Sequence, residues 1–126
     1  MNKKIISTEK APGAIGPYSQ AVRIGDMIYT SGQIPMNPST GEMVTEIKAA
    51  TKQCLENVKA ILEVEGAQMS NIIKTTVFLQ DMNDFVAMNE VYASYFPENP
   101  PARSAVQVSR LPKDSIVEIE VIALVK

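Results

Sequence analysis

Short segments rich in apolar and β-branched residues, several of them alternating with polar residues, recur along the chain. Such segments are typical of strands with two different faces, and they cover residues 4–8, 19–24, 27–31, 72–79, 103–108 and 116–125. Gly25 and Asp26 separate the second segment from the third, and glycine accepts the positive φ angle of a tight hairpin. Residues 11–17 and 32–41 are rich in Gly, Pro and small side chains, which predicts loops.

Two longer segments carry apolar residues at helical spacing. In residues 47–65 these are Ile47, Ala50, Cys54, Val58, Ile61 and Leu62. Gly66 follows where a helix C-cap glycine is expected. Residues 85–96 predict a second helix, which Pro97 cannot continue. Cys54 lies within the first apolar stripe, which indicates a buried core residue rather than a nucleophile.

The predicted order is three strands, a helix, a strand, a helix and two strands. Both helices need a sheet to cover their apolar stripes. We therefore predict an α+β fold with two layers, in which a mixed sheet carries both helices on one face. The chain has 126 residues and no internal repeat or linker, which suits a single domain over residues 1–126.

Side chains of the last two predicted strands point alternately to the two faces of the sheet. In residues 117–121 the aliphatic side chains share one face, and Glu118 and Glu120 share the other. In the preceding strand Arg103 and Val106 fall on opposite faces. Because the helices should cover the aliphatic side, we expect Arg103, Glu118 and Glu120 together on the uncovered face.

Two interpretations of these charges stay open. They are either solvated on an open sheet, or they line a cleft where this face packs against other subunits. Pro100 and Pro101 favour the cleft, because they fix the backbone ahead of Arg103. Arginine is the planar donor that suits bidentate recognition of a carboxylate.

The composition excludes several kinds of active site and partner. The chain has no histidine and one cysteine, which excludes Ser-His and Cys-His nucleophiles within one chain and leaves no basis for a zinc site. No acidic cluster suggests another metal. The net charge of -2, with scattered Lys and Arg, predicts no nucleic-acid partner. Without a signal-peptide pattern or a bilayer-length apolar run, we expect a cytoplasmic protein that does not bind membranes.

Six ordered segments carry a more specific pattern. They are residues 14–21 (AIGPYSQA), 30–35 (TSGQIP), 74–78 (KTTVF), 101–104 (PARS), 110–114 (RLPKD) and 117–120 (VEIE). With these segments the chain resembles, nearly end to end, the RidA/YjgF family of enamine/imine deaminases. That family also carries the older labels translation inhibitor and L-PSP endoribonuclease.

The resemblance implies a chorismate-mutase-like fold and a homotrimer with a cleft between each pair of subunits. It implies no cofactor and no metal. The implied activity is that of a 2-iminobutanoate/2-iminopropanoate deaminase, a hydrolase acting on a C–N bond other than a peptide bond. Its 2-imino acid substrates, formed from 2-aminoacrylate and related enamines, give 2-keto acids and ammonia. Because PLP-dependent dehydratases release these reactive compounds, the implied role is control of metabolite damage.

The resemblance also assigns roles to single residues. The family's carboxylate-binding arginine falls on Arg103 and its water-positioning glutamate on Glu118, which are the implied catalytic residues. Besides Arg103, the implied substrate-binding residues are Tyr18, Ser31, Gly32, Asn89 and Ala105. Many members have a cysteine at the position of Ala105, so here only the backbone of Ala105 is left to contact a substrate.

Two other functions stay open at this stage. A trimer of this kind could bind a small carboxylate without turning it over and regulate a partner protein. The older family labels add a ribonuclease or translation-inhibitor function. The acidic composition and the absence of histidine argue against that function.

Overall fold

The computed structural model describes residues 2–125. These residues form the strands β1 (Lys3–Ile6), β2 (Ala21–Ile24), β3 (Met27–Thr30), β4 (Ile72–Leu79), β5 (Ala102–Gln107) and β6 (Val117–Leu124). The α-helices are α1 (Ile47–Glu63) and α2 (Phe85–Tyr95), and short 3-10 helices are η1 (Met69–Asn71), η2 (Met82–Asp84) and η3 (Pro112–Asp114). The predicted order of strands and α-helices is confirmed.

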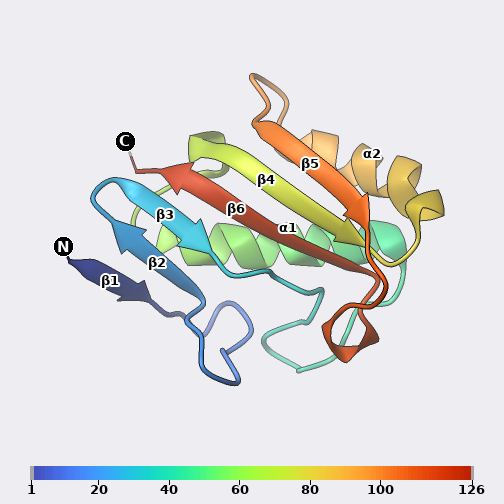
Figure 1. Cartoon of the computed structure of the whole chain (residues 1–126), viewed down its shortest axis with the longest axis horizontal. Helices are drawn as coiled ribbons and strands as arrows, with labels where there is room; N and C mark the ends of the chain where they lie inside the picture. The colour runs from blue at the N-terminus through green and yellow to red at the C-terminus, as the bar shows by residue number, and fades with distance from the viewer. Residues whose placement is uncertain (1, 126) are drawn as a thin grey trace.

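The strands form one sheet in the order β1-β2-β3-β6-β4-β5. β4 and β5 are parallel, because α2 crosses over between them, and the other neighbouring pairs are antiparallel. Figure 1 shows both helices on the same side of this sheet, which confirms the two-layer α+β architecture. No helix within residues 2–125 has the length and apolar character needed to cross a membrane.

The core lies between α1 and the central strands. Its fully buried members include Leu55, Val58, Ile61 and Leu62 of α1 and Val117 and Ile119 of β6. Cys54 is buried among them, and its thiol donates to the carbonyl oxygen of Val117 over 3.7 Å. Burial raises the pKa of the Cys54 thiol well above its ordinary value. The prediction that Cys54 is a core residue and not a nucleophile agrees with this environment.

Hydrogen bonds define both ends of α1. The carboxylate of Glu46 accepts from the backbone amides of Lys48 (2.8 Å) and Ala49 (3.0 Å), so Glu46 is the N-cap. At the other end Gly66 has a φ of 74°, and its amide donates to the carbonyl of Glu63 over 3.1 Å. The predicted capping position of Gly66 is confirmed, and the helix ends two residues earlier than the periodicity predicted.

The prediction that Arg103 lies on the uncovered face is wrong. β5 pairs with β4 so that Arg103 lies opposite Thr75, and Thr75 lies opposite Val121 of β6. Residues that are opposite one another across strands point to the same face, and Val121 is buried on the side of the helices. Arg103 therefore points to the helix side. Glu118 and Glu120, which alternate with the buried residues of β6, point to the open side as predicted.

The error has a physical cause at the edge of the sheet. The aliphatic pattern predicts that Val106 faces the helices. Val106 instead lies opposite Phe78, which lies opposite Glu118, so Val106 is on the open face, where it is 43% exposed. β5 is an edge strand, where neither face is deeply covered by its own chain. Hydrophobicity therefore does not decide which side of β5 faces the helices.

An ion-pair cluster ties the first two strands to the end of α1. The side chain of Glu65 is only 4% exposed, and it contacts Lys4 of β1 at 3.0 Å and Arg23 of β2 at 3.1 Å. The hydrogen bond from Lys4, together with that from Arg23, lowers the pKa of Glu65. The cluster holds the edge strand β1 against the helix layer.

We expect Glu65→Gln to lower the free energy of unfolding by up to about 1 kcal/mol at neutral pH. Because the folded pKa of Glu65 is depressed, its stabilisation is present above the unfolded pKa and is lost as the pH falls through the folded pKa. Urea unfolding at about pH 7 and about pH 3 measures this difference, which should shrink in acid. Glu63→Gln, at the exposed last residue of α1, is the control. Equal losses for the two variants at neutral pH contradict the assignment.

Candidate functional site

The first candidate site is a pocket at the end of the sheet where β3 ends and β6 begins. It has a volume of about 610 Å³, and its lining includes Tyr18, Ser31, Gly32, Glu118 and Glu120. We call it the Glu118 pocket. It brings together four of the residues that the resemblance singled out, from three separate segments of the chain.

Glu118 is half-buried in this pocket. Burial, and after it the negative charge of Glu120, raises the pKa of the Glu118 carboxyl. A raised pKa brings a carboxyl closer to the pH at which it can both take up and release a proton. Glu118 therefore has the environment of a general acid–base residue.

Gly32 makes room for that carboxylate. Gln33 and Ile119 exchange backbone hydrogen bonds of 2.8 Å and 3.1 Å, which hold the segment of Gly32 against β6. A Cβ atom at Gly32 would lie 2.7 Å from Cδ and Oε2 of Glu118, closer than real contacts allow. A side chain at this position would therefore force the Glu118 carboxylate to move, so space and not a positive φ angle accounts for the glycine. The space that Gly32 leaves is occupied by a side chain of the protein itself, the Glu118 carboxylate.

Ser31 and Tyr18 complete the pocket in different ways. The Ser31 hydroxyl donates to the carbonyl of Ser19 over 2.6 Å, so its proton is already in use. Tyr18 is 52% exposed, and its hydroxyl accepts a long hydrogen bond (3.4 Å) from the amide of Ile15. Tyr18 is therefore a partly free aromatic side chain at the rim.

Gln20 is a residue of this pocket that the sequence analysis missed. It is 3% exposed, and its side-chain oxygen accepts a hydrogen bond from the backbone amide of Thr8. Its side-chain nitrogen donates to the carbonyls of Thr8, Ala11 and Pro12. These bonds fix the loop that forms one wall. A buried glutamine next to a Gly-Pro loop carries no pattern that distinguishes this role beforehand.

Arg103 lies in a second, separate pocket of about 380 Å³, between β5 and α2. Its guanidinium lies 4.7 Å from the ring centre of Tyr92 and 5.4 Å from that of Phe85. Its Nη1 donates to Oδ1 of Asn89 over 2.6 Å. Phe85 and Tyr92 of α2 thus form an aromatic platform for the arginine, which the sequence analysis did not indicate.

The Arg103 guanidinium keeps binding capacity. Arginine has five N–H donors in a planar fork, and one of them is used by Asn89. Within residues 2–125 no carboxylate forms an ion pair with it. Tyr92 is itself held by a 2.7 Å hydrogen bond with Thr75. A rigid and charge-unpaired guanidinium of this kind is suited to an external carboxylate.

The resemblance implied that Ala105 binds the substrate, but Ala105 lines neither of these two pockets. It follows Arg103 by two residues on the helix side, lies opposite Val77 and packs against the core. Asn89 lies in the Arg103 pocket, as a hydrogen-bond partner of the arginine. Tyr18, Ser31, Gly32 and Glu118 lie in the other pocket. The predicted site residues thus fall into two halves that one copy of the chain does not bring together.

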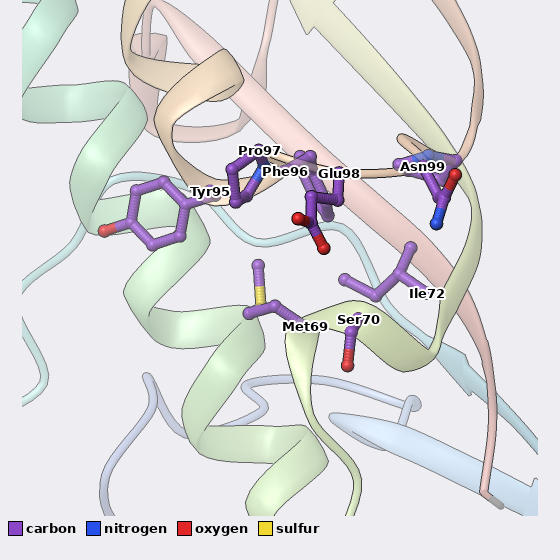
Figure 2. A pocket seen from close by; sticks show the side chains of 9 residues that line it. Met69, Ser70, Ile72, Tyr95, Phe96, Pro97, Glu98 and Asn99 are labelled. Carbon is purple, nitrogen blue, oxygen red and sulfur yellow. The ribbon is translucent and has the colours of Figure 1, made fainter.

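A smaller pocket of about 230 Å³ lies between η1 and the segment that joins α2 to β5. Figure 2 shows the side chain of Glu98 pointing into it, towards Met69 and Ser70. None of the predicted site residues lines it, and it has no cationic side chain among its lining residues. Elsewhere in residues 2–125, no three side chains of the metal-binding types gather closely enough to hold a metal ion.

Comparisons with known proteins agree with the sequence pattern. A family model described as Endoribonuclease L-PSP matches residues 8–125. A RutC family protein of Pyrococcus abyssi is 57% identical over 124 residues, which is 98% of each chain. The 2-iminobutanoate/2-iminopropanoate deaminase of Escherichia coli strain K12 is 54% identical over 124 residues, covering 96% of this chain and 97% of that protein.

Solved structures agree as well. The crystal structure of E. coli TdcF with bound serine matches with a TM-score of 0.93 at 52% identity, covering 96% of this chain and 98% of that one. The YjgF gene product of E. coli matches with a TM-score of 0.94 at 52% identity, covering 98% and 99%. The family and the fold predicted from the sequence are therefore confirmed. This chain belongs to the Endoribonuclease L-PSP family, among the RutC and RidA/YjgF proteins.

Proposed function

We propose that this protein is a 2-iminobutanoate/2-iminopropanoate deaminase that works without a cofactor as a homotrimer. In this proposal Arg103 of one copy and Glu118 of the next copy act on the same substrate. The observation on which the proposal rests is that the predicted site residues lie in two separate pockets. A carboxylate-binding half and an acid–base half lie on opposite faces of the sheet, and neither is sufficient alone.

The open face of the sheet supports assembly with further copies. It exposes the apolar side chains of Ile5, Tyr29, Val106 and Leu124, and an extended apolar surface of this kind is typical of an interface. The Arg103 pocket and the Glu118 pocket are different surfaces, so a contact that joins them is head-to-tail. Head-to-tail contacts that close produce rings, of which a trimer is one.

Arg103 supplies the anchor for the substrate carboxylate. Two parallel hydrogen bonds from the guanidinium fork orient a planar carboxylate, and a hydrogen bond to a charged group contributes about 1.5–3 kcal/mol. Tyr92 and Phe85 stack on the guanidinium, and Asn89 fixes its rotation. The substrate is therefore held in one orientation relative to Glu118.

Glu118 moves the protons of the reaction. Ionised Glu118 takes a proton from water while the water oxygen forms a bond to the imine carbon, and it returns that proton to the nitrogen. In the resulting carbinolamine, Glu118 takes the hydroxyl proton and passes it to the amine. The C–N bond then breaks, ammonia leaves and the 2-keto acid remains. The raised pKa of Glu118, caused first by burial, favours both directions of transfer.

A function in binding alone is the second candidate. E. coli TdcF was crystallised with bound serine, and serine is a small carboxylate like the proposed substrate. Calorimetry with 2-oxobutanoate, run beside an assay of 2-iminobutanoate decay, separates the two functions. Binding without turnover identifies a sensor, and turnover identifies the deaminase.

The ribonuclease named in the family description fits the geometry less well. RNA phosphates need cationic contacts, whereas two of the three charged residues that line the Glu118 pocket are the carboxylates Glu118 and Glu120. The chain also contains no histidine and has a net charge of -2. We therefore retain the imine-hydrolysing function as the proposal.

We expect Arg103→Lys to lower kcat/KM for 2-iminobutanoate hydrolysis between about 10- and 100-fold. Lysine keeps the charge but loses the bidentate fork and the flat surface that stacks on Tyr92. The decay of 2-iminobutanoate generated in situ measures the rate. Arg23→Lys, in the ion-pair cluster of Glu65, is the control and should keep the wild-type rate. A normal rate for Arg103→Lys contradicts the anchor.

We expect Glu118→Gln to lower kcat about 100-fold or more while 2-oxobutanoate binding is retained. The pKa of Glu118 is higher in the folded protein than in the unfolded chain. Ionised Glu118 therefore lowers the stability of the fold when the pH lies above the folded pKa, and this loss is absent when the pH lies below the unfolded pKa. The thermal midpoint of Glu118→Gln should therefore exceed that of the wild type near neutral pH and match it in acid. Loss of binding together with dissociation of the oligomer would instead make Glu118 structural.

We expect Gly32→Ala to lower kcat/KM at least about 10-fold, because the added Cβ displaces the Glu118 carboxylate. Gly13→Ala is a matched control: Gly13 lines the same pocket, and a Cβ there meets no atom within 4 Å. The same assay compares the two variants. Equal activity of both shows that the position of the Glu118 carboxylate does not depend on Gly32.

A further inference from the structure

The loop between β5 and β6 holds two consecutive residues in a rare backbone conformation. Lys113 and Asp114 have φ angles of 56° and 55°, the left-handed region that residues other than glycine seldom occupy. Each such residue costs free energy, and strain of this kind gathers at functional sites. Glycine would relieve the strain, so a lysine at position 113 requires another explanation.

Hydrogen bonds hold this loop in place around Lys113. The carboxylate of Asp114 accepts two bonds from the guanidinium of Arg110, at 2.7 Å and 3.3 Å. Ser115 is 2% exposed, and its hydroxyl donates to the carbonyl of Pro112 over 2.9 Å. These contacts account for Arg110, Asp114 and Ser115. They leave the side chain of Lys113 without a structural partner in the loop.

Lys113 is one of the residues that line the Glu118 pocket. The other charged side chains that line it, Glu118 and Glu120, are both negative. In the part of the chain that the structure describes, no carboxylate lies within 4.0 Å of the Lys113 ammonium. Lys113 therefore stands at the exposed rim with its charge available to a ligand.

The two glutamates create a difficulty for an anionic substrate. A carboxylate that enters the pocket is repelled by like charges before it reaches the imine-hydrolysing position. A cation at the rim offsets that repulsion, and its attraction extends over about 10 Å at moderate ionic strength. The backbone conformation of Lys113 fixes the point beside the pocket from which this side chain starts.

We propose that Lys113 is a specificity-determining residue of the imine-hydrolysing site, whose ammonium attracts and contacts the carboxylate of 2-imino acids as they enter the Glu118 pocket. The inference rests on the proposed function. Arg103 holds the carboxylate in the reacting complex, and Lys113 acts on the approach to it. Lys113 thus favours anionic imines over uncharged ones of the same size.

The test compares wild type, Lys113→Asn, Lys113→Arg and Lys52→Gln at low and high salt. Asparagine tolerates the left-handed conformation and removes the charge, and Lys113→Arg retains the charge. Lys52 is an exposed residue of α1 that does not line the pocket, so Lys52→Gln controls for net charge. Steady-state hydrolysis of 2-iminobutanoate gives KM and kcat, and calorimetry with 2-oxobutanoate gives Kd.

For Lys113→Asn we expect KM and Kd to rise about two- to fivefold at low salt, with kcat unchanged, and to converge on the wild-type values at high salt. Lys113→Arg and Lys52→Gln should behave as wild type, and thermal unfolding of Lys113→Asn should show no loss of stability. If the wild type binds and hydrolyses but Lys113→Asn matches it at low salt, the role of Lys113 is refuted and the deaminase remains. If the wild type neither hydrolyses 2-iminobutanoate nor binds 2-oxobutanoate, the proposed function fails and the role of Lys113 fails with it.

Discussion

The pleat of the central sheet directs Arg103 and Glu118, the two proposed catalytic residues, towards opposite faces. Glu118 alternates with the buried aliphatic residues of β6 and so points away from the helices. The parallel pairing of β5 with β4 turns Arg103 towards α2. A shift of one residue in either register would reverse one of these directions. Under the proposed function, the backbone hydrogen bonds of the sheet are therefore the reason that a complete site would need a second copy of the chain.

Each half of the site is built from its own set of local contacts. Around Glu118, Gly32 leaves space for the carboxylate, and burial next to Glu120 raises its pKa. Around Arg103, aromatic rings cover the guanidinium and Asn89 orients it. In both halves the organising contacts come from other residues of the protein itself. Organisation in advance reduces the cost of ordering the side chains when a substrate binds.

The sequence was informative about the strands and helices and supplied candidate site residues. Periodicity and the glycines at 25 and 66 located the hairpin and the end of α1, and the resemblance identified Arg103 and Glu118. The face on which Arg103 lies was not predictable, because β5 is an edge strand. Arg103 and Val106 point to opposite faces of this strand, and hydrophobicity wrongly assigns Val106 to the helix side. The contact between Gly32 and Glu118 and the proposed role of Lys113 were also not predictable from the sequence. One depends on a contact between distant segments, and the other on a φ angle that a lysine rarely adopts.

The central claim is that one catalytic site draws Arg103 and Glu118 from two different copies. Mixing Arg103→Ala and Glu118→Gln chains, each inactive by itself, tests it directly after dissociation and reassembly. In randomly mixed trimers with head-to-tail contacts, every mixed ring contains one intact site, so about a quarter of the wild-type activity should return. If the mixture stays as inactive as the separate variants although mixed oligomers form, the two residues do not act together across an interface.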